Sequence, residues 1–477
     1  MSLIEKKLKQ FSKKYANYTA IETCDFIITY KKLYQYVSYL KKKISSSKEK
    51  NIIIYGEKKS LCIIAILACL FSGITYIPMS KSTPLYRLKK IIKKTKSNII
   101  INCSKNKINL KIKKINIHDL SFFENEFISS INFKKNLKND IAYIIFTSGS
   151  TGEPKGVCIS YKSLDHYVVW LNKNFIIGPN NSCLQYADIG FDLSVADIYG
   201  TLTSAGRLYV VESEYDKIFP AKIIKEKKIN NLVIVPSIID LISNSNELKL
   251  LSNVKKIFFC GEPLTKNHMK KVFKFNSHVV VLNAYGPTEF TCSCSCIKLN
   301  NNNYNQYSND SMSFGKPNKG IFFKLIDNYK KNTGELVISG KQMFKNYLEQ
   351  KELTKQKLLI INKKKYYKTG DIIKYYKKNY YFIKRKDNQV KIKGMRIELT
   401  EIDFHLKKLG CEFSYSFIKG KKIYSLIKSK YNCVAFKNKL SKVIPIYMIP
   451  DKIIKLKKII YNQNNKIDYN KLKNNIY

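Results

Sequence analysis

Short apolar runs alternate with longer amphipathic stretches along the first two thirds of the chain. Apolar runs bounded by Gly, Pro or polar residues are typical of buried parallel strands, and amphipathic stretches are typical of helices that cover such a sheet. The pattern therefore predicts an α/β fold, with sheets flanked by helices. We expect strands at residues 51–56, 97–103, 141–147, 207–212, 231–236, 255–261 and 279–286.

The pattern changes after the polar segment at residues 300–311. Short alternating runs that are typical of antiparallel strands follow it, at residues 334–340, 365–376 and 379–394. The last part of the chain has a helix pattern of its own, TEIDFHLKKLG. We therefore predict a large domain over residues 1–386, which ends in a β subdomain, and a small α+β domain over residues 387–477.

Residues 61–79 carry no charge and are long enough to suggest a membrane span. Ser72, Gly73, Thr75 and Pro78 interrupt this run, so a buried helix that continues into a buried strand explains it better. The N-terminus lacks the apolar core and cleavage site of a signal peptide. We therefore predict no membrane span and a cytoplasmic protein, in which the 12 cysteines remain reduced thiols.

The formal net charge of +51 raises the question of nucleic-acid binding. The lysines are scattered along the whole chain and do not form one basic segment, so we expect no nucleic-acid partner. Only four of the 86 basic residues are arginines: Arg87, Arg207, Arg385 and Arg396. In such a chain, we expect a remaining arginine to make the planar, forked contacts that lysine cannot make.

Three closely spaced cysteines, Cys292, Cys294 and Cys296, suggest a metal cluster at first sight. On a strand, a spacing of two residues would put all three on one face, whereas zinc sites favour two to four residues between paired cysteines. We therefore expect buried small side chains rather than a metal site. The five histidines show no ligand or triad spacing.

The stretch FTSGSTGEPKG at residues 146–156 follows a buried strand and combines glycines, hydroxyl groups and one lysine. It is not a Walker loop, because Lys155 follows Pro154 rather than the last glycine of the motif. Backbone N–H groups of such a loop can still surround phosphate oxygens. Taken alone, the stretch fits either a phosphate-binding loop or an ordinary turn.

Further blocks give the loop a context, because with it they resemble, in the same order, the signature motifs of the adenylate-forming superfamily. That superfamily contains acyl-CoA synthetases, luciferases and the adenylation domains of nonribosomal peptide synthesis. The resemblance implies a large domain that binds ATP and an acid, and a small mobile C-terminal domain. The matching blocks are GITYIPMSKSTPLYRL, FDLSVADIYG, NAYGPTE, GELVISG, YKTGD, KRKDNQVKIKGMRIEL, IYMIP and NNKIDYNKL.

The resemblance also implies which residues bind ATP. The loop residues that would hold the β- and γ-phosphates are Thr147, Ser148, Gly149, Ser150, Thr151, Gly152 and Lys155. The residues around the adenine would be Gly261, Glu262, Asn283, Ala284, Tyr285 and Gly286, with Tyr285 stacked on the ring and Asn283 bonded to its amino edge. Asp371 would accept the ribose hydroxyl groups, assisted by Arg385.

Catalytic roles follow from the same resemblance. Thr288 would touch the α-phosphate, Glu289 would help to bind Mg²⁺, and Lys466 would bridge the attacking carboxylate and the α-phosphate. Asp387 would be the hinge of the small domain, whose loop with Gly394 would reach the site for the second step. The structural alternatives for individual motifs are turns, a helix cap at Glu289 and a surface ion pair at Arg385.

The chain departs from the family pattern at three positions where glycine is usual. These are Asn346, Lys384 and Asn465, the last directly before Lys466. Asn tolerates positive φ better than most residues do, so the loop before Lys466 can keep its shape. The departures put the local geometry in doubt rather than the reaction.

FDLSVADIYG resembles the amino-acid-activating branch of the superfamily, in which the Asp of this motif pairs with the substrate's α-ammonium group. Asp192 occupies that position, and its alternative role is the N-cap of a helix. By the same resemblance, the residues around the substrate's side chain would be apolar and uncharged: Leu193, Ala196, Ile234, Phe258, Cys260, Ala284, Cys292 and Ser293.

FFCGEPL and FDLSVADIY resemble the D-alanine:D-alanyl-carrier-protein ligases, stand-alone enzymes of this branch. We therefore predict an ATP-dependent, Mg²⁺-assisted, AMP-forming ligase that activates a small amino acid, with D-alanine as the first choice. The chain ends soon after Lys466, so we expect a monomer that passes the aminoacyl group to the phosphopantetheine thiol of a separate carrier protein. The alternatives are an L-amino-acid adenylation enzyme, an acyl-CoA or aryl-acid ligase, and a non-catalytic binding protein.

Overall fold

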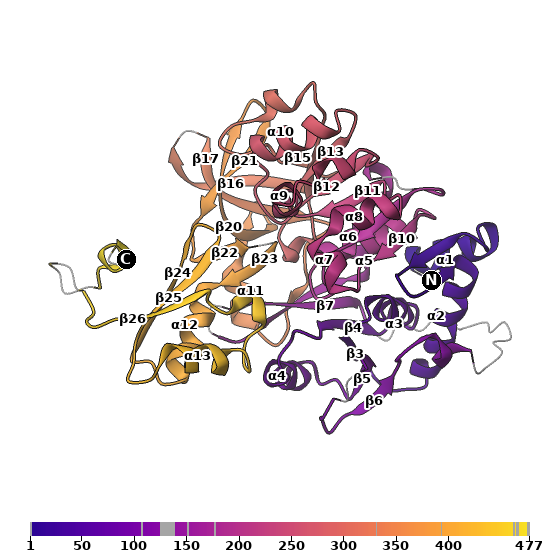
Figure 1. The fold of residues 1–477 in the computed structure, drawn as a ribbon, viewed down its shortest axis with the longest axis horizontal. Coiled ribbons are helices and arrows are strands. Elements are labelled where there is room, and N and C mark those ends of the chain that lie inside the picture. The colour runs from indigo at the N-terminus through magenta and orange to yellow at the C-terminus, as the bar shows by residue number, and fades with distance from the viewer. Residues whose placement is uncertain are drawn as a thin grey trace.

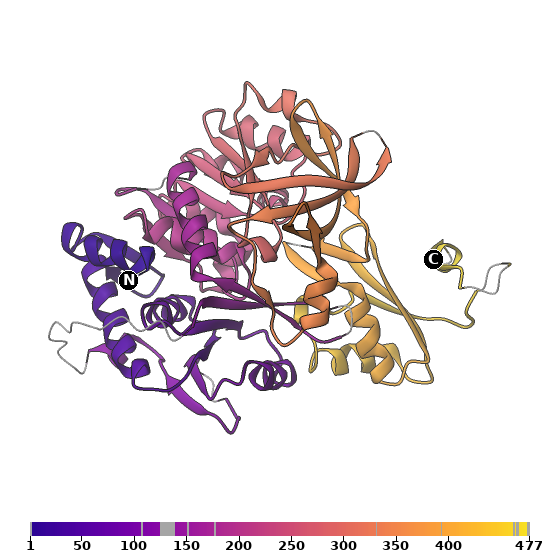
Figure 2. The same ribbon diagram turned by 180° about the vertical axis from the view of Figure 1, so that it is seen from behind.

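The computed structural model describes residues 2–105, 108–124, 139–149, 152–175, 178–330, 332–392, 394–460, 463 and 467–474. A large body of sheets and helices carries a smaller C-terminal region at its side (Figure 1). The C-terminal helix α14 (Tyr469–Asn474) lies at the outer edge in both views, away from the N-terminus (Figures 1 and 2).

The first sheet orders seven strands as β18-β8-β7-β4-β3-β5-β6. Its parallel core pairs β3, β4 and β5, whereas β7 and β8 form an antiparallel hairpin, and the connection of that hairpin is the predicted phosphate loop. The strands are β3 (Asn51–Gly56), β4 (Thr75–Ser80), β5 (Ile99–Cys103), β6 (Lys113–Asn116), β7 (Ile141–Thr147), β8 (Lys155–Ser160) and β18 (Asn346–Tyr347).

The second sheet orders nine strands as β15-β14-β13-β12-β11-β9-β10-β1-β2, parallel from β13 to β1. The strands are β1 (Thr19–Glu22), β2 (Ile27–Thr29), β9 (Ser182–Gln185), β10 (Arg207–Val210), β11 (Asn231–Ile234), β12 (Lys256–Phe259), β13 (Val280–Tyr285), β14 (Ser295–Leu299) and β15 (Lys316–Pro317). The carboxyl ends of its parallel strands carry the predicted adenine-binding residues.

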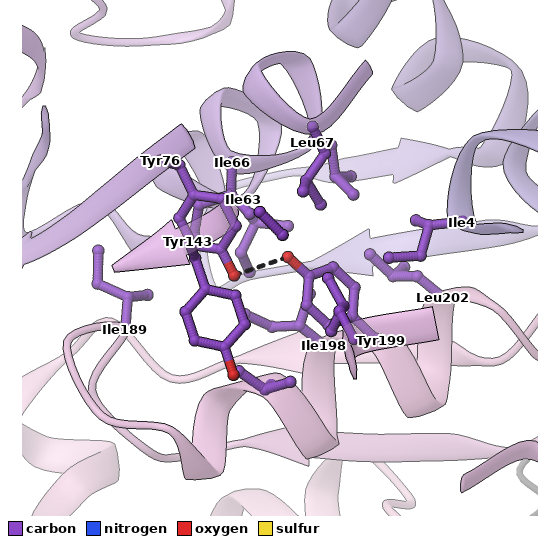
Figure 3. Packing of buried hydrophobic residues seen from close by; sticks show 14 of the residues in the cluster. Ile4, Ile63, Ile66, Leu67, Tyr76, Tyr143, Ile189, Ile198, Tyr199 and Leu202 are labelled. Carbon is purple, nitrogen blue, oxygen red and sulfur yellow. Dashed lines mark hydrogen bonds between the residues drawn. The ribbon is translucent and has the colours of Figure 1, made fainter. Parts of the chain in front are cut away.

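Helices cover both sheets, and the two sheets share one large apolar cluster. Figure 3 shows Tyr76 of β4 and Tyr143 of β7 packed with Tyr199 of α6, whose hydroxyl donates to that of Tyr76 at 2.9 Å. The helices are α1 (Leu3–Lys14), α2 (Tyr30–Ser45), α3 (Lys59–Phe71), α4 (Leu85–Thr95), α5 (Tyr161–Asn174), α6 (Leu193–Leu202), α7 (Glu214–Ile218), α8 (Pro220–Glu226), α9 (Pro236–Asn244), α10 (Lys266–Phe275) and α11 (Lys351–Lys357).

A third, antiparallel sheet follows in the chain, in the order β16-β17-β20-β19, with β21 paired to β20. Its strands are β16 (Ile321–Lys330), β17 (Thr333–Gly340), β19 (Leu358–Ile361), β20 (Lys364–Tyr376) and β21 (Asn379–Arg385). The sheet brings the predicted ribose-binding residues, Asp371 and Arg385, opposite each other in register on β20 and β21.

The C-terminal region is α+β and has its own apolar cores. It opens with the hairpin of β22 (Gln389–Ile392) and β23 (Met395–Glu398), which leads directly into α12 (Leu399–Lys408). A three-stranded sheet and two helices complete it: β24 (Phe413–Lys419), β25 (Lys422–Lys428), β26 (Lys452–Lys455), α13 (Cys433–Leu440) and α14.

The fold class and the predicted strands are confirmed, with ends that differ by at most two residues. The predicted strand run at 379–394 divides into β21 and β22, because residues 386–388 leave the third sheet. The apolar run at 61–79 is the buried helix α3 followed by β4, as predicted. Among the described residues, none of the helices combines the length and hydropathy that a bilayer crossing requires.

One expectation about the cysteine cluster is wrong. Cys292 and Cys294 do not lie on a strand with Cys296, because β14 begins only at Ser295 and Cys292 has a φ of 73°. The turn before β14 therefore breaks the alternation that the spacing suggested. Cys292 and Cys294 are buried, and within the described part of the chain no group of three His, Cys, Asp or Glu residues is placed to hold a metal ion.

Candidate active site

A cavity that is partly open to solvent lies beside the carboxyl ends of β12 and β13. Tyr285 forms part of its wall and stacks on Phe314 with 4.4 Å between ring centroids. All six predicted adenine-binding residues line this cavity: Gly261, Glu262, Asn283, Ala284, Tyr285 and Gly286. The two groups of residues are 21 or more positions apart in the sequence, and the sheet brings them together because β12 and β13 are parallel neighbours.

The predicted ribose-binding residues adjoin the cavity through hydrogen bonds. The Tyr285 hydroxyl donates to Asp371 Oδ2 at 2.5 Å, and Arg385 Nη1 donates to Asp371 Oδ1 at 2.7 Å. Burial raises the pKa of Tyr285 well above its ordinary value, and the charge of Asp371 adds to this effect. Tyr285 therefore remains a hydrogen-bond donor to the carboxylate.

Arg385 makes the forked contact expected of a retained arginine. Its Nε and Nη2 atoms donate to the two oxygens of Asp387 at 2.9 and 2.6 Å, while Nη1 also donates to the Thr369 carbonyl at 2.6 Å. A lysine ammonium could not satisfy these partners in one plane. Arg385 thus connects the ribose side of the site to the predicted hinge.

The predicted phosphate loop contacts the C-terminal region. The Ser148 hydroxyl donates to the Arg396 carbonyl at 2.9 Å and accepts from the Glu398 N–H at 3.0 Å. The Gly149 N–H donates to Glu401 Oε2 at 2.9 Å. Lys155 Nζ lies 3.0 Å from Glu398 Oε1, and both side chains are buried.

The remaining loop residues are placed as follows. Thr147 ends β7, and its buried hydroxyl oxygen has no hydrogen-bond partner in the described structure. Gly152 has a φ of 76°, and the ring of Phe404 on α12 lies so close that an added Cβ would come within 2.0 Å of it. Ser150 and Thr151 lie outside the described residues.

Glu289, the predicted metal ligand, is buried between two donors. Arg396 Nη1 donates to its Oε2 at 2.8 Å, and the Tyr347 hydroxyl donates to its Oε1 at 2.5 Å. Burial would raise the pKa of Glu289, but the charge of Arg396 and the Tyr347 hydroxyl lower it to about 2. Glu289 is thus a carboxylate at neutral pH, the kind of oxygen ligand that fits Mg²⁺ together with phosphate oxygens.

Asp192, the predicted ammonium-binding residue, stands at the N-cap position of α6, but its side chain makes no capping hydrogen bond. Its Oδ2 instead accepts from the Thr288 hydroxyl at 2.6 Å. Burial raises the pKa of Asp192, and no ion pair to it occurs among the described residues. This arrangement disfavours the helix-cap alternative.

The predicted side-chain pocket lies on the face of the second sheet that meets the large cluster. Phe258 of β12 is in register with Leu282 of β13, so by alternation Cys260 and Ala284 share its face. Cys260 Sγ lies 3.8 Å from the Cys292 carbonyl, and the Ser293 hydroxyl donates to that of Tyr167 at 3.1 Å. Leu193 and Ala196 approach this cluster from α6.

Ile234 is placed differently from the prediction. It pairs with Phe259, whereas its neighbour Val233 pairs with Phe258. Successive strand residues point to opposite faces. Ile234 therefore packs in an apolar cluster beneath α9 and α10, whereas Val233 packs in the large cluster with Phe258 and Cys260. Ile234 thus packs in a different apolar cluster from the other predicted pocket residues on this sheet, Phe258, Cys260 and Ala284.

The predicted second-step loop lies at the site. The Gly394 N–H donates to Glu262 Oε1 at 2.8 Å, and the Ser237 N–H donates to Glu262 Oε2 at 3.0 Å. Gly394 has a φ of 76°, and an added Cβ would lie 2.4 Å from Val235 Cγ1. The backbone therefore passes through a gap that admits only glycine.

Lys466, the predicted catalytic lysine, lies outside the described residues, as does Asn465. The residues that follow them, Ile467 and Leu472, pack against Phe413 and Phe417 of β24. Of the other two departures from the family pattern, neither Asn346 nor Lys384 has a positive φ, so neither needs the freedom of glycine.

Sequence reasoning did not assign four residues that contact the site or its loop. Arg396 and Glu398 come from β23, Glu401 from α12, and Arg87 from α4, where its Nη1 lies 2.5 Å from Glu401 Oε1. The scarcity of arginine was a signal for Arg87 and Arg396. The two glutamates had no comparable signal.

A protein-family model described as AMP-binding enzyme matches residues 8–348 of the chain. Among curated proteins, the D-alanine--D-alanyl carrier protein ligase of Bacillus licheniformis is 31% identical over 506 residues, which cover 98% of this chain and 99% of that protein. The protein of the same name from Staphylococcus epidermidis is 31% identical over 490 residues, with 98% and 97% covered.

Solved structures share the fold. The Vibrio cholerae adenylation domain AlmE, in complex with glycyl-adenosine-5'-phosphate, has a TM-score of 0.82 at 21% identity, covering 99% of this chain and 96% of that one. A double mutant of the Bacillus subtilis o-succinylbenzoate CoA synthetase has a TM-score of 0.82 at 16% identity, with 98% of each chain covered. The same fold thus serves aminoacyl and CoA chemistry.

Proposed function

This chain belongs to the AMP-binding enzyme family and is an AMP-forming adenylating ligase that uses ATP, and we propose that its acid substrate is a small, uncharged amino acid, with D-alanine as the first choice. The aminoacyl group would then pass to the phosphopantetheine thiol of a separate carrier protein. The names of the two curated relatives support both parts of this proposal.

One observation carries the amino-acid assignment. The Asp192 carboxylate is partly buried and has a hydroxyl partner, Thr288, but no ion-pair partner in the described part of the chain, and the charges of Lys391 and Arg396 act on it only from farther away. A carboxylate in such surroundings is stable when a cation joins it, and the α-ammonium group of an amino acid is that cation. Fatty and aryl acids carry no such group.

The adenosine part of ATP would occupy the cavity beside Tyr285. Asp371 has two carboxylate oxygens that suit the two ribose hydroxyl groups, and Arg385 holds Asp371 in place. Asn283 Nδ2 donates to the Ser313 carbonyl at 2.8 Å, which orients the amide at the cavity wall. These contacts position the α-phosphorus for in-line attack by the carboxylate of the amino acid.

The β- and γ-phosphates would lie against the Gly149 N–H and the Lys155 ammonium group, where hydrogen bonds and charge stabilise the leaving pyrophosphate. Glu289 would hold Mg²⁺, which supplies charge neutralisation to the phosphates when bound. Thr288 would contact the α-phosphate, and Lys466 would neutralise the charge that develops between the two reacting groups.

For the second step, the small domain would turn about Asp387 so that the loop with Gly394 forms the thiol-accepting site. A single site must first release pyrophosphate and then admit a long thiol arm, which is the physical reason for such a movement. The contact between Gly394 and Glu262 supports this role for the loop.

Pyrophosphate exchange with a panel of acids tests the substrate. We expect D-alanine to support exchange better than L-alanine, glycine, L-valine, L-leucine, L-cysteine, a fatty acid or an aryl acid. A tenfold preference for L-valine or L-leucine would replace D-alanine by an L-amino acid. A preference for a fatty or aryl acid would reject the amino-acid assignment, and exchange with no acid would indicate a binding protein.

Asp192→Ala tests the ammonium contact itself. We expect it to remove roughly 3–5 kcal/mol of the discrimination between an amino acid and its deaminated analogue in pyrophosphate exchange. Asp310→Ala, at an exposed aspartate in the polar loop, is the matched control and should change nothing. Unchanged discrimination in Asp192→Ala would refute the contact.

A further inference from the structure

Three groups that the proposed function assigns to pyrophosphate and its metal ion have partners from one short stretch of the C-terminal region. Lys155 pairs with Glu398, and the Gly149 N–H bonds to Glu401. Glu289 pairs with Arg396. The carboxylates of Glu398 and Glu401 thus bind the two groups proposed to hold pyrophosphate. The guanidinium group of Arg396 binds the carboxylate proposed to hold the metal ion.

These contacts are buried and interlinked. The side chains of Lys155 and Glu398 are 7% and 9% exposed, and that of Glu289 is 1% exposed. Glu401 is fully buried, and its second oxygen binds Arg87 at 2.5 Å. A surface contact would be worth little, but charges desolvated to this degree must be paired for the arrangement to persist.

The three side chains come from one short, continuous segment of the chain. Arg396 and Glu398 are two residues apart on β23 and so point to the same face, while Glu401 stands in the first turn of α12. The Ser148 hydroxyl bonds to the backbone of β23 at both Arg396 and Glu398, which fixes the register of the strand against the loop. Withdrawing β23 would therefore release all three ligand groups together.

We propose that Arg396, Glu398 and Glu401 compete with magnesium pyrophosphate for the same three groups, namely Lys155, the Gly149 N–H and Glu289. The three side chains present their charges in the same arrangement as the metal ion and the phosphoryl oxygens would. The inference rests on the proposed function, because it assumes that the Gly149–Lys155 loop and Glu289 bind Mg²⁺ and the leaving pyrophosphate. Arg396 takes the position of the divalent cation, and the two glutamates take the positions of phosphoryl oxygens.

The consequence is an order of events. The hairpin of β22 and β23 cannot enter the site while pyrophosphate and its metal ion are bound, because Glu398 and Glu401 would meet the negative charge of pyrophosphate and Arg396 would meet the positive charge of the metal ion. Once pyrophosphate leaves, the buried carboxylates and guanidinium group satisfy the vacated ligands and hold the hairpin in place. The site for the carrier's thiol then forms only after the first product has departed.

Hydrogen exchange of the hairpin amides, followed by mass spectrometry on the full chain, measures this competition directly. The probe is inorganic pyrophosphate with Mg²⁺, in the absence of amino acid and carrier. We expect residues 389–398 to be protected without the probe and to exchange faster as its concentration rises. No change at saturating pyrophosphate, or no binding of pyrophosphate at all, would overturn the proposal.

Variants test the side chains. The double variant Glu398→Gln/Glu401→Gln removes both negative charges that compete with pyrophosphate. If the state with the hairpin in the site is about tenfold more populated than the state with the hairpin withdrawn, loss of this preference should lower the dissociation constant for pyrophosphate about tenfold. Glu398→Gln alone should give a smaller fall, and it keeps Glu401 paired with Arg87. Equal or weaker pyrophosphate binding in both variants would contradict the proposal.

Glu412→Gln is the matched control, because Glu412 is an exposed carboxylate of the same region that pairs only with Lys428 in the described structure. It should leave the pyrophosphate affinity unchanged. Thermal unfolding checks that each variant is folded. These measurements need no acid substrate, so a wrong substrate leaves them interpretable, while a separate pyrophosphate-exchange assay reports on the proposed function.

Discussion

The proposed adenosine side and the proposed phosphate side of the site differ in what satisfies their polar groups. On the adenosine side, Tyr285, Asp371 and Arg385 hold one another around an open cavity, and Arg385 also binds Asp387. On the phosphate side, Lys155 and Glu289 are held by residues of the C-terminal region instead. One side is preformed, and the other depends on where the small region lies.

The difference separates the two steps of the proposed reaction. The AMP part of the substrate is bound in both steps, so the groups around it can be permanent. Pyrophosphate is bound only in the first step, so its ligands need a second set of partners afterwards. Mutations on the two sides should therefore affect the half-reactions unequally.

The largest effect is expected for Lys466→Ala, because this variant removes a group that would serve only the first half-reaction. Loss of a preorganised cation from developing negative charge typically costs about 10²–10³ in rate. Pyrophosphate exchange should fall by this factor, while transfer from a chemically synthesised aminoacyl adenylate should continue. Exchange at the normal rate would show that another lysine is catalytic.

Gly394→Ala should have the opposite selectivity. A left-handed alanine costs about 1–2 kcal/mol, and the overlap with Val235 adds about 1–3 kcal/mol. Together they should slow transfer to the carrier about 10²-fold, with exchange preserved. The matched control is Gly420→Ala, which has a φ of 63° but open space around its Cβ, so only the backbone cost applies. Equal loss in both variants would exclude a role for the close contact.

Asp387→Pro changes the residue that Arg385 links to the proposed adenosine side, and it should affect the two half-reactions unequally. Proline restricts φ and removes the carboxylate that holds Arg385, so a hinge at this residue would be blocked. A strained backbone residue costs roughly 1–3 kcal/mol, so transfer should fall about thirtyfold more than exchange does. Equal losses in the two half-reactions, measured in parallel, would count against a hinge here.

The smallest effect is expected for Lys155→Ala. Its ammonium group shares the phosphate charge with backbone N–H groups and the metal ion, so the loss should be near the lower end for a charged hydrogen bond, about tenfold in exchange. Transfer should fall by no more than exchange does, because Glu398 loses its buried ion pair with Lys155 but keeps the hydrogen bond that it accepts from Gln389 at 2.7 Å. A larger loss in transfer than in exchange would reverse the assignment of Lys155 to the first step.

The adenosine side could be predicted from sequence more fully than the phosphate side. Asn283 and Tyr285 lie in one motif at a strand end, and the parallel pairing of neighbouring strands carries Gly261 to the same cavity. The contacts of Glu289 with Arg396 and of Gly149 with Glu401 join residues 107 and 252 positions apart. No local pattern encodes such a pairing, because it depends on how two regions that are distant in the sequence meet.

The proposed substrate pocket shows a second limit of prediction from sequence, which concerns the direction of a single strand side chain. Ile234 lies on the opposite face of its strand from the side that Phe258 and Cys260 share, and a shift of one residue in a sequence match is enough to reverse the direction of a strand side chain. The buried strands here are apolar on both faces, so hydrophobic alternation could not correct the register.

Helix α3 has a consequence for the synthesis of the protein. Every residue of Lys59–Phe71 is buried, and Ile63, Ile66 and Leu67 pack with Ile198 and Leu202 of α6 (Figure 3). The ribosome synthesises α3 before α6. At a translation rate of about 5–20 residues per second, the delay between the two helices is on the order of ten seconds. During that time the nascent chain displays an apolar segment without its cover, so we expect molecular chaperones to bind this segment until translation has passed α6.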